Sequence, residues 1–115
     1  MSHVIDINAG QLDGYLKQGK PLLLLIWIRS CDKCSRFKPI FNRLPDYYPD
    51  VKFLSMNMFG SLENLRLTEK YEKENTPIIP AFCDGKHLGT FFGYFSMIDF
   101  REKLDEIFEN NNCFA

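Results

Sequence analysis

The chain has 115 residues, of which 45% are apolar and 25% charged, with a formal net charge of -1. This length and apolar content predict one globular domain over residues 1–115 that can bury a core without metal or disulfides. No stripe of lysine and arginine stands out, which argues against nucleic acid as a ligand.

Neither a secretory signal nor a membrane span is predicted. The N-terminal residues lack a basic stretch followed by an apolar one. The longest apolar run, residues 21–28, is far shorter than the roughly 20 residues that a membrane span needs. We therefore expect a cytoplasmic or nuclear protein without a membrane partner.

The first half of the chain predicts two strands and two helices. Residues 4–7 form a short predicted strand, after which Asn8 can cap a helix. Residues 22–28 are continuously apolar and too short for most helices, which indicates a strand buried on both faces. From Cys31 the apolar residues recur at helical spacing. Pro39 lies inside this second helix and should kink it.

The second half predicts a strand, a helix, a hairpin and a last helix. The predicted segments are a strand over 51–58, a weaker helix over 61–73, strands over 78–83 and 87–94, and a helix that begins after Ser96. The apolar face of the weaker helix is predicted to hold Leu62, Leu65 and Tyr71. Asp84-Gly85 is a hairpin signal, and residues 110–115 should form a frayed tail.

The predicted order is β-α-β-α-β-α-β-β-α. Alternating strands and helices that end in a hairpin and a helix indicate an α/β fold. Its central mixed sheet should be flanked by helices on both faces, because its strands are too apolar to face water.

Cys31 and Cys34 lie where the buried strand gives way to a helix. A thiol at a helix N-terminus faces unpaired backbone N–H groups, which favour the thiolate and lower its pKa. Cys31 would then attack a disulfide, and Cys34, one turn further on, would resolve the mixed disulfide. Lys33 adds positive charge nearby and Asp32 negative charge, and the sequence leaves their net effect open.

Other interpretations of the cysteines stay open. A zinc site is one alternative, although one CxxC supplies only two of four ligands and His3 and His87 lack finger-like spacing. An iron–sulfur cluster shared by two chains and a vestigial pair in a binding module are two more. We expect Cys83 to be a half-buried strand residue and Cys113 an exposed tail thiol, neither with a designed role.

Several residues also match the spacing of a known family. Trp27 lies four residues before Cys31, Pro39 five after Cys34, Pro77 eight before Gly85, and Gly93 eight after Gly85. From about residue 4 to residue 108 the chain resembles the thioredoxin family. The resemblance implies the thioredoxin fold, a cis Thr76–Pro77 bond and a Thr76 backbone that pairs with a substrate peptide.

The resemblance also implies that Trp27, Thr76, Pro77 and Gly93 border the substrate, although Trp27 fits the wall of the site better than a catalytic role. Pro80 is the rival for the cis position. We prefer Pro77, because the choice of Pro80 would leave a very short strand before the hairpin turn. That choice places Pro80 in a central strand, where proline is disfavoured.

The chain departs from the thioredoxin pattern at the site itself. Thioredoxins usually carry Trp before the first cysteine and Gly-Pro between the two, where this chain has Ser30 and Asp32-Lys33. Leu25 replaces a buried Asp that assists proton removal from the second cysteine, and Ser55 replaces a lysine. These departures predict slow turnover, a shifted redox potential or loss of general reductase activity.

Two functional hypotheses follow. The first is a thiol–disulfide oxidoreductase that reduces protein disulfides through Cys31 and Cys34, needs no bound cofactor, works as a monomer and is restored by a thioredoxin-reductase-type donor. The second is a redox-inactive or redox-regulated adaptor that binds proteins. "YYPDVKF" and the spacing of "YEKENTP" favour it, because they resemble phosducin-like thioredoxin domains, which generally lack a CxxC.

Overall fold

The computed structural model describes residues 3–72 and 75–114. Its elements are β1 (Ile5–Asp6), α1 (Ala9–Leu16), β2 (Leu22–Trp27), α2 (Asp32–Arg43), the short 3-10 helix η1 (Leu44–Asp46), β3 (Lys52–Asn57), α3 (Leu62–Glu69), β4 (Ile78–Cys83), β5 (Lys86–Phe92) and α4 (Met97–Asn110). This order confirms the predicted α/β arrangement. The predicted second helix continues through Pro39 to its end, and residue 73, the predicted end of the third, lies outside the described residues.

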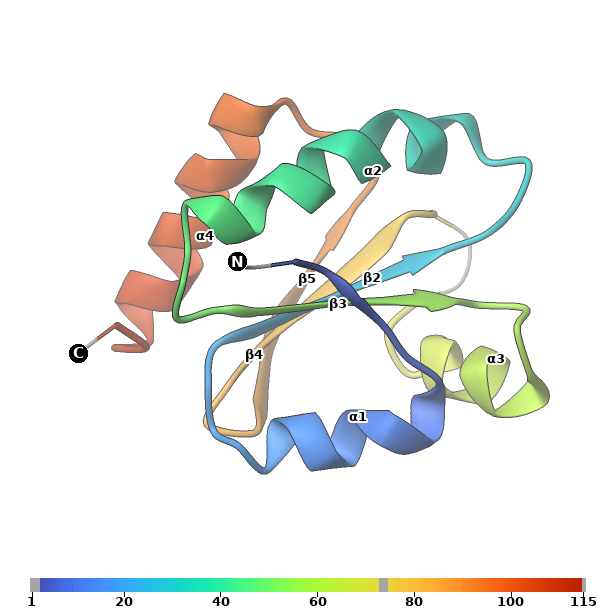
Figure 1. Ribbon diagram of the computed structural model, residues 1–115, viewed down its shortest axis with the longest axis horizontal. Coiled ribbons are helices and arrows are strands. Elements are labelled where there is room, and N and C mark those ends of the chain that lie inside the picture. Colours follow the sequence, from blue (N-terminus) through green and yellow to red (C-terminus); the bar gives the residue numbers. More distant parts are fainter. Residues whose placement is uncertain (1–2, 73–74, 115) are drawn as a thin grey trace.

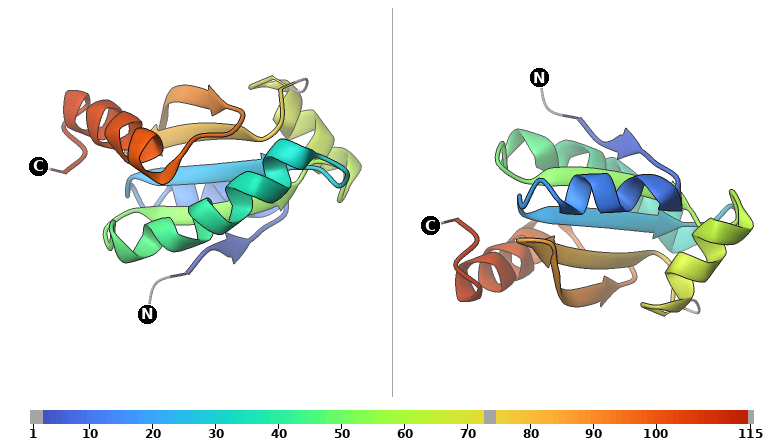
Figure 2. Two further views of the ribbon diagram at one scale, coloured as in Figure 1. Left: turned by 90° about the horizontal axis from the view of Figure 1, so that it is seen from above. Right: turned by 90° about the horizontal axis from the view of Figure 1, so that it is seen from below.

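The strands form one mixed sheet in the order β1-β3-β2-β4-β5. β1, β3 and β2 run parallel, while β4 is antiparallel to both β2 and β5. Helices α2 and α4 cover one face of the sheet, and α1 and α3 cover the other (Figures 1 and 2). Among the described residues, no helix combines the length and apolar character that crossing a membrane requires.

Strand β2 is buried on both faces, as its sequence predicted. Leu23 and Leu25 belong to the core between the sheet and helices α2 and α4. Leu22, Leu24 and Ile26 belong to the second core, on the side of α1 and α3. Because alternate residues of a strand point to opposite faces, a strand between two helical layers must be apolar throughout.

Helix α3 corrects one prediction. Leu62, assigned to its apolar face, is 60% exposed, whereas Asn64 and Thr68 are buried. The Asn64 side chain accepts a hydrogen bond from the Ala9 N–H at 2.7 Å and donates one to the Asn57 carbonyl at 3.0 Å. Leu65 and Tyr71 do pack against the second core, as predicted. The prediction is therefore wrong for Leu62 alone, and the hydrogen bonds of Asn64 anchor the helix in addition to its apolar contacts.

The C-terminal tail is also ordered differently from the prediction. Residues up to Asn110 belong to α4, and the Cys113 N–H then donates to the Phe108 carbonyl at 2.9 Å. Cys113 is joined to Cys83 in a disulfide, so neither is the isolated thiol that the sequence suggested. The Phe114 ring stacks on Tyr48, with ring centroids 6.5 Å apart.

The core between the sheet and helices α2 and α4 is centred on Phe100. Its side chain is fully buried, and its ring lies 5.0 Å from Phe37 of α2, 5.3 Å from Phe95 and 5.4 Å from Phe91 of β5, measured between centroids. Tilted and edge-to-face pairs of this kind add to the free energy of apolar burial. Phe100 thus holds together the helix that carries the cysteine pair and the last strand.

We predict that Phe100→Ala lowers the free energy of unfolding by about 3–5 kcal/mol, because it leaves a cavity among three rings. Urea unfolding followed by circular dichroism measures this loss. The matched control is Ile98→Ala on the same helix, where the side chain is 74% exposed, and the expected change is within about 0.5 kcal/mol. Equal losses in the two variants would contradict this account of the core.

Candidate redox site

The cysteine pair lies just after β2, at the start of α2. Strand β2 ends at Trp27, and the chain turns through Ser30, whose backbone φ of 58° is left-handed. Cys31 then adopts an extended conformation as the N-cap of α2, which begins at Asp32. The cysteine therefore occupies the helix terminus that the sequence predicted.

The sulfur of Cys31 receives two polar contacts. The Cys34 N–H donates to it over 3.1 Å, and the Thr76 Oγ1 lies 3.3 Å from it. Cys31 and Cys34 form a disulfide with their Cα atoms 5.2 Å apart. Cys31 is partly exposed, whereas Cys34 is 3% exposed. In the reduced protein the same donors would face the Cys31 thiolate, and solvent reaches only this member of the pair freely.

The loop before β4 brings a distant segment onto the cysteines. The Thr76–Pro77 bond is cis, as the resemblance implied, and Pro77 is buried beside the first residue of β4. The Gly93 N–H donates to the Pro77 carbonyl at 2.9 Å, and Gly93 has a φ of 86°, a conformation that glycine adopts without strain. Thr76 thus contacts Cys31, and the neighbouring Pro77 is bonded to Gly93.

Pro80 is accommodated inside the sheet. It lies in β4, between β2 and β5, where its missing N–H should cost a ladder hydrogen bond. The residue pairs between β2 and β4 are Leu22 with Phe82, Leu23 with Ala81, and Ile26 with Ile78. The β2–β4 register skips Pro80, whereas Pro80 stays paired with Thr90 of β5. The missing N–H therefore falls on the side of β4 where Pro80 forms no residue pair, which explains how a central strand tolerates it.

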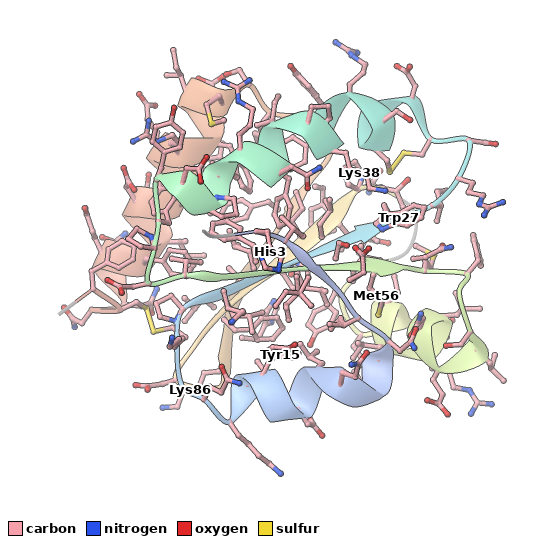
Figure 3. All side chains as sticks on the ribbon, in the orientation of Figure 1. His3, Tyr15, Trp27, Lys38, Met56 and Lys86 are labelled. Atoms are coloured by element: carbon pink, nitrogen blue, oxygen red, sulfur yellow. A yellow bond between two sulfur atoms is a disulfide. The ribbon has the colours of Figure 1, made fainter. Side chains whose placement is uncertain are left out.

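Trp27, the last residue of β2, lies between the core and the surface. Its side chain is half-buried and packs against the core, and the ammonium of Lys38 lies 3.7 Å from its ring centroid (Figure 3). The indole Nε1 is buried, and no described residue accepts a hydrogen bond from it. This placement favours the structural role that the sequence suggested over a catalytic one.

The charges around the pair lie at the surface. The Asp32 carboxylate lies 3.7 Å from the Arg36 guanidinium, and both side chains are largely exposed. Arg36 also lies over the Tyr94 ring, 4.7 Å from its centroid. Lys33 is exposed. Solvent screens such pairs, so Asp32 and Lys33 can modulate the thiolate only weakly.

Sequence reasoning missed an acid that contacts one of the positions where the chain departs from the thioredoxin pattern. Leu25 is buried, and the Ser55 hydroxyl donates to the Asp6 carboxylate across β3 and β1. Leu25, Ser55, Asp6 and Lys38 line one cavity of about 410 Å³. The register that sets Asp6 opposite Ser55 is a pairing between distant segments, which no local pattern announces. The Thr76 hydroxyl at Cys31 was missed for the same reason.

Comparison with known proteins supports the architecture. No protein-family model matches the chain. Thioredoxin f from spinach chloroplast, in its short form, is 20% identical with a TM-score of 0.80, over 91% of this chain and 93% of that one. Thioredoxin f2 from Chlamydomonas reinhardtii is 15% identical with a TM-score of 0.77, over 90% and 94%.

A third similar chain comes from a structure on the thiol-resolving mechanism in yeast mitochondrial 1-Cys peroxiredoxin via glutathione/thioredoxin systems. It is 18% identical with a TM-score of 0.77, over 91% of this chain and 99% of that one. Identities this low establish the backbone architecture alone. The α/β arrangement and these superpositions together show that this chain has the thioredoxin fold.

Proposed function

We propose that the protein is a thiol–disulfide oxidoreductase that reduces disulfides in partner proteins. The observation that carries this proposal is the asymmetry of the pair: Cys31 is partly exposed and contacted by the Cys34 N–H and the Thr76 hydroxyl, while Cys34 is buried one turn away. An accessible thiolate that attacks and an enclosed thiol that resolves are what disulfide exchange needs.

The exchange begins with the reduced pair. The Cys31 thiolate attacks one sulfur of the partner's disulfide, forms a mixed disulfide and releases the other sulfur as a thiolate. The Cys34 thiol gives up its proton and attacks the Cys31 Sγ, which releases the partner's second sulfur as a thiolate. The partner gains two electrons, and the Cys31–Cys34 disulfide of the structure is the oxidised product. A dithiol or a thioredoxin-reductase-type donor returns the two electrons.

The substrate would lie along the loop that covers the pair. Thr76 precedes the first residues of β4, and Pro77 has no N–H to donate. An extended peptide could therefore pair with the Thr76 backbone and bring its disulfide to Cys31. Trp27 and Gly93 would border that peptide. These assignments rest on the resemblance to thioredoxins and on the contact between Thr76 and the Cys31 sulfur.

We predict that Cys34→Ser accumulates a covalent adduct with insulin, used as a disulfide substrate, and that Cys31→Ser accumulates none. The reason is that only Cys31 can reach the substrate, and only Cys34 can release it. Both variants carry Cys83→Ser and Cys113→Ser, so that no other thiol reacts. Non-reducing electrophoresis and mass spectrometry measure the adduct. Equal trapping by both variants, or by neither, would contradict the assigned roles.

We predict that Thr76→Val raises the pKa of the Cys31 thiol by about half to one unit, because it removes a hydroxyl 3.3 Å from the sulfur. The rate of iodoacetamide alkylation as a function of pH gives this pKa. Thr90→Val is the matched control, since the Thr90 hydroxyl bonds to His87 on β5 and should leave Cys31 unchanged. An unaltered pKa in Thr76→Val would show that the hydroxyl does not stabilise the thiolate.

The second candidate function is a protein-binding adaptor without exchange activity. Leu25 is buried where the resemblance implies an acid, and Ser30 and Asp32-Lys33 replace the usual residues of the motif. Exposed aromatic side chains could serve docking instead: Phe59 is 65% exposed and Tyr94 39% exposed. Reduction of insulin by dithiothreitol separates the two functions.

For the oxidoreductase, we predict that the wild-type chain accelerates insulin reduction, that Cys31→Ser/Cys34→Ser abolishes the acceleration, and that Cys83→Ser/Cys113→Ser preserves it. The pKa of Cys31 should lie below the free-thiol value of about 8.5, because the helix terminus favours the thiolate. Absence of acceleration together with a Cys31 pKa near 8.5 would favour the adaptor.

A further inference from the structure

A second disulfide lies far from the first. Cys83 closes β4, whose other end begins beside Pro77 at the redox site. A strand of six residues spans roughly 17–20 Å, so neither Cys31 nor Cys34 can reach Cys83 within one molecule. Figure 3 shows the two disulfide bonds at opposite ends of the fold.

Backbone hydrogen bonds hold Cys113 in place in addition to the disulfide. After α4, the Cys113 N–H donates to the Phe108 carbonyl and the Asn112 N–H to the Glu109 carbonyl. These two bonds are the Schellman pattern of a helix end, which requires a left-handed residue. Asn112 supplies it with a φ of 57°, and asparagine is among the few residues other than glycine that tolerate this conformation.

Cys83 is held with equal firmness. It pairs with Lys86 across a hairpin whose two turn residues, Asp84 and Gly85, have φ of 55° and 74°. The Asp84 N–H also donates to the Gly19 carbonyl at 3.2 Å. The Cα atoms of Cys83 and Cys113 lie 6.2 Å apart, within the range of about 4.4–6.8 Å that a disulfide spans. Both backbones are thus held by hydrogen bonds as well as by the disulfide.

Aromatic side chains around the tail link the Cys83–Cys113 disulfide to the packing of α4. Phe114 stacks on Tyr48 and packs on Phe108, with centroids 6.5 Å and 5.5 Å apart. The Tyr48 hydroxyl donates to the Asp105 carboxylate at 2.8 Å. Burial, followed by this hydrogen bond, raises the pKa of Tyr48 to about 12, so the donor stays protonated at neutral pH. Tying Cys113 to β4 therefore holds the end of α4 against the sheet.

From this placement we propose that Cys83 and Cys113 are a second thiol–disulfide site, independent of Cys31 and Cys34, whose oxidation by a small-molecule disulfide clamps the C-terminal turn to β4. Cys113 is the entry point, because it is partly exposed while Cys83 is 8% exposed.

The reaction proceeds in two exchanges. The Cys113 thiolate attacks the small-molecule disulfide, forms a mixed disulfide and releases one small-molecule thiolate. The Cys83 thiol loses its proton, attacks the Cys113 Sγ and releases the second thiolate. Two protein thiols are oxidised, one disulfide is reduced to two thiols, and the protons pass to the two released sulfurs.

The test uses the full chain with Cys31→Ser/Cys34→Ser, which isolates the second pair. Glutathione buffers of increasing oxidised fraction are the probe, and acid quenching, alkylation, trypsin digestion and mass spectrometry are the readout. We expect the peptides 74–86 and 104–115 to become linked by a disulfide. Alkylation of the reduced protein should modify Cys113 faster than Cys83. The melting temperature should rise by about 10 °C on oxidation, because the bond closes a loop of 30 residues.

Cys83→Ser/Cys113→Ser is the control. It cannot form the second disulfide, so its melting temperature should lack the rise of about 10 °C that this bond produces. The wild-type chain must yield the same linked peptides, which keeps the test valid if the Cys31→Ser/Cys34→Ser variant folds poorly. Glutathione adducts on Cys113 without linked peptides would overturn the proposal. Linked peptides without a rise in melting temperature would overturn the clamp.

Discussion

The Cys34 N–H donates a hydrogen bond to the sulfur of Cys31, with the nitrogen and the sulfur 3.1 Å apart, and the arrangement of the site depends on this contact. It exists because Cys31 stands outside the first turn of α2, in an extended conformation, where the first N–H groups of a helix have no partner. Strand β2, which precedes Cys31, fixes the position of this cysteine, because the strand is buried on both faces and paired with β3 and β4. A helix terminus on so rigid a support can hold a thiolate without rearrangement.

Strand β4 connects the two ends of the fold. At its start, the loop of Thr76 and Pro77 covers the first cysteine pair, and at its end Cys83 joins the C-terminal turn. Both places use backbone conformations that few residues adopt, and both bring together segments far apart in the chain. The separation along β4 keeps the chemistry of one pair from reaching the other, so one thioredoxin fold carries two disulfides with different surroundings.

Much of the architecture could be predicted from residues within one turn or one strand of each other. Asn8 and Ser96 occupy the helix starts that the sequence predicted, and so does Cys31. The unbroken apolar run of β2 predicted a strand between two layers of helices. The burial of Asn64 in α3 could not be predicted, because its hydrogen-bond partners Ala9 and Asn57 belong to other elements.

The sequence by itself determined the order of elements, the caps and the placement of Cys31 and Cys34, because these rest on hydrogen bonds and burial patterns of a few neighbouring residues. Only the tertiary structure decided that the Thr76 hydroxyl faces Cys31, that Asp6 bonds to Ser55, and that a tail cysteine meets the end of β4. These contacts join residues 45 and 49 positions apart in the first two cases and 30 in the last. Their geometry follows from sheet register and layer packing, which no stretch of neighbouring residues encodes.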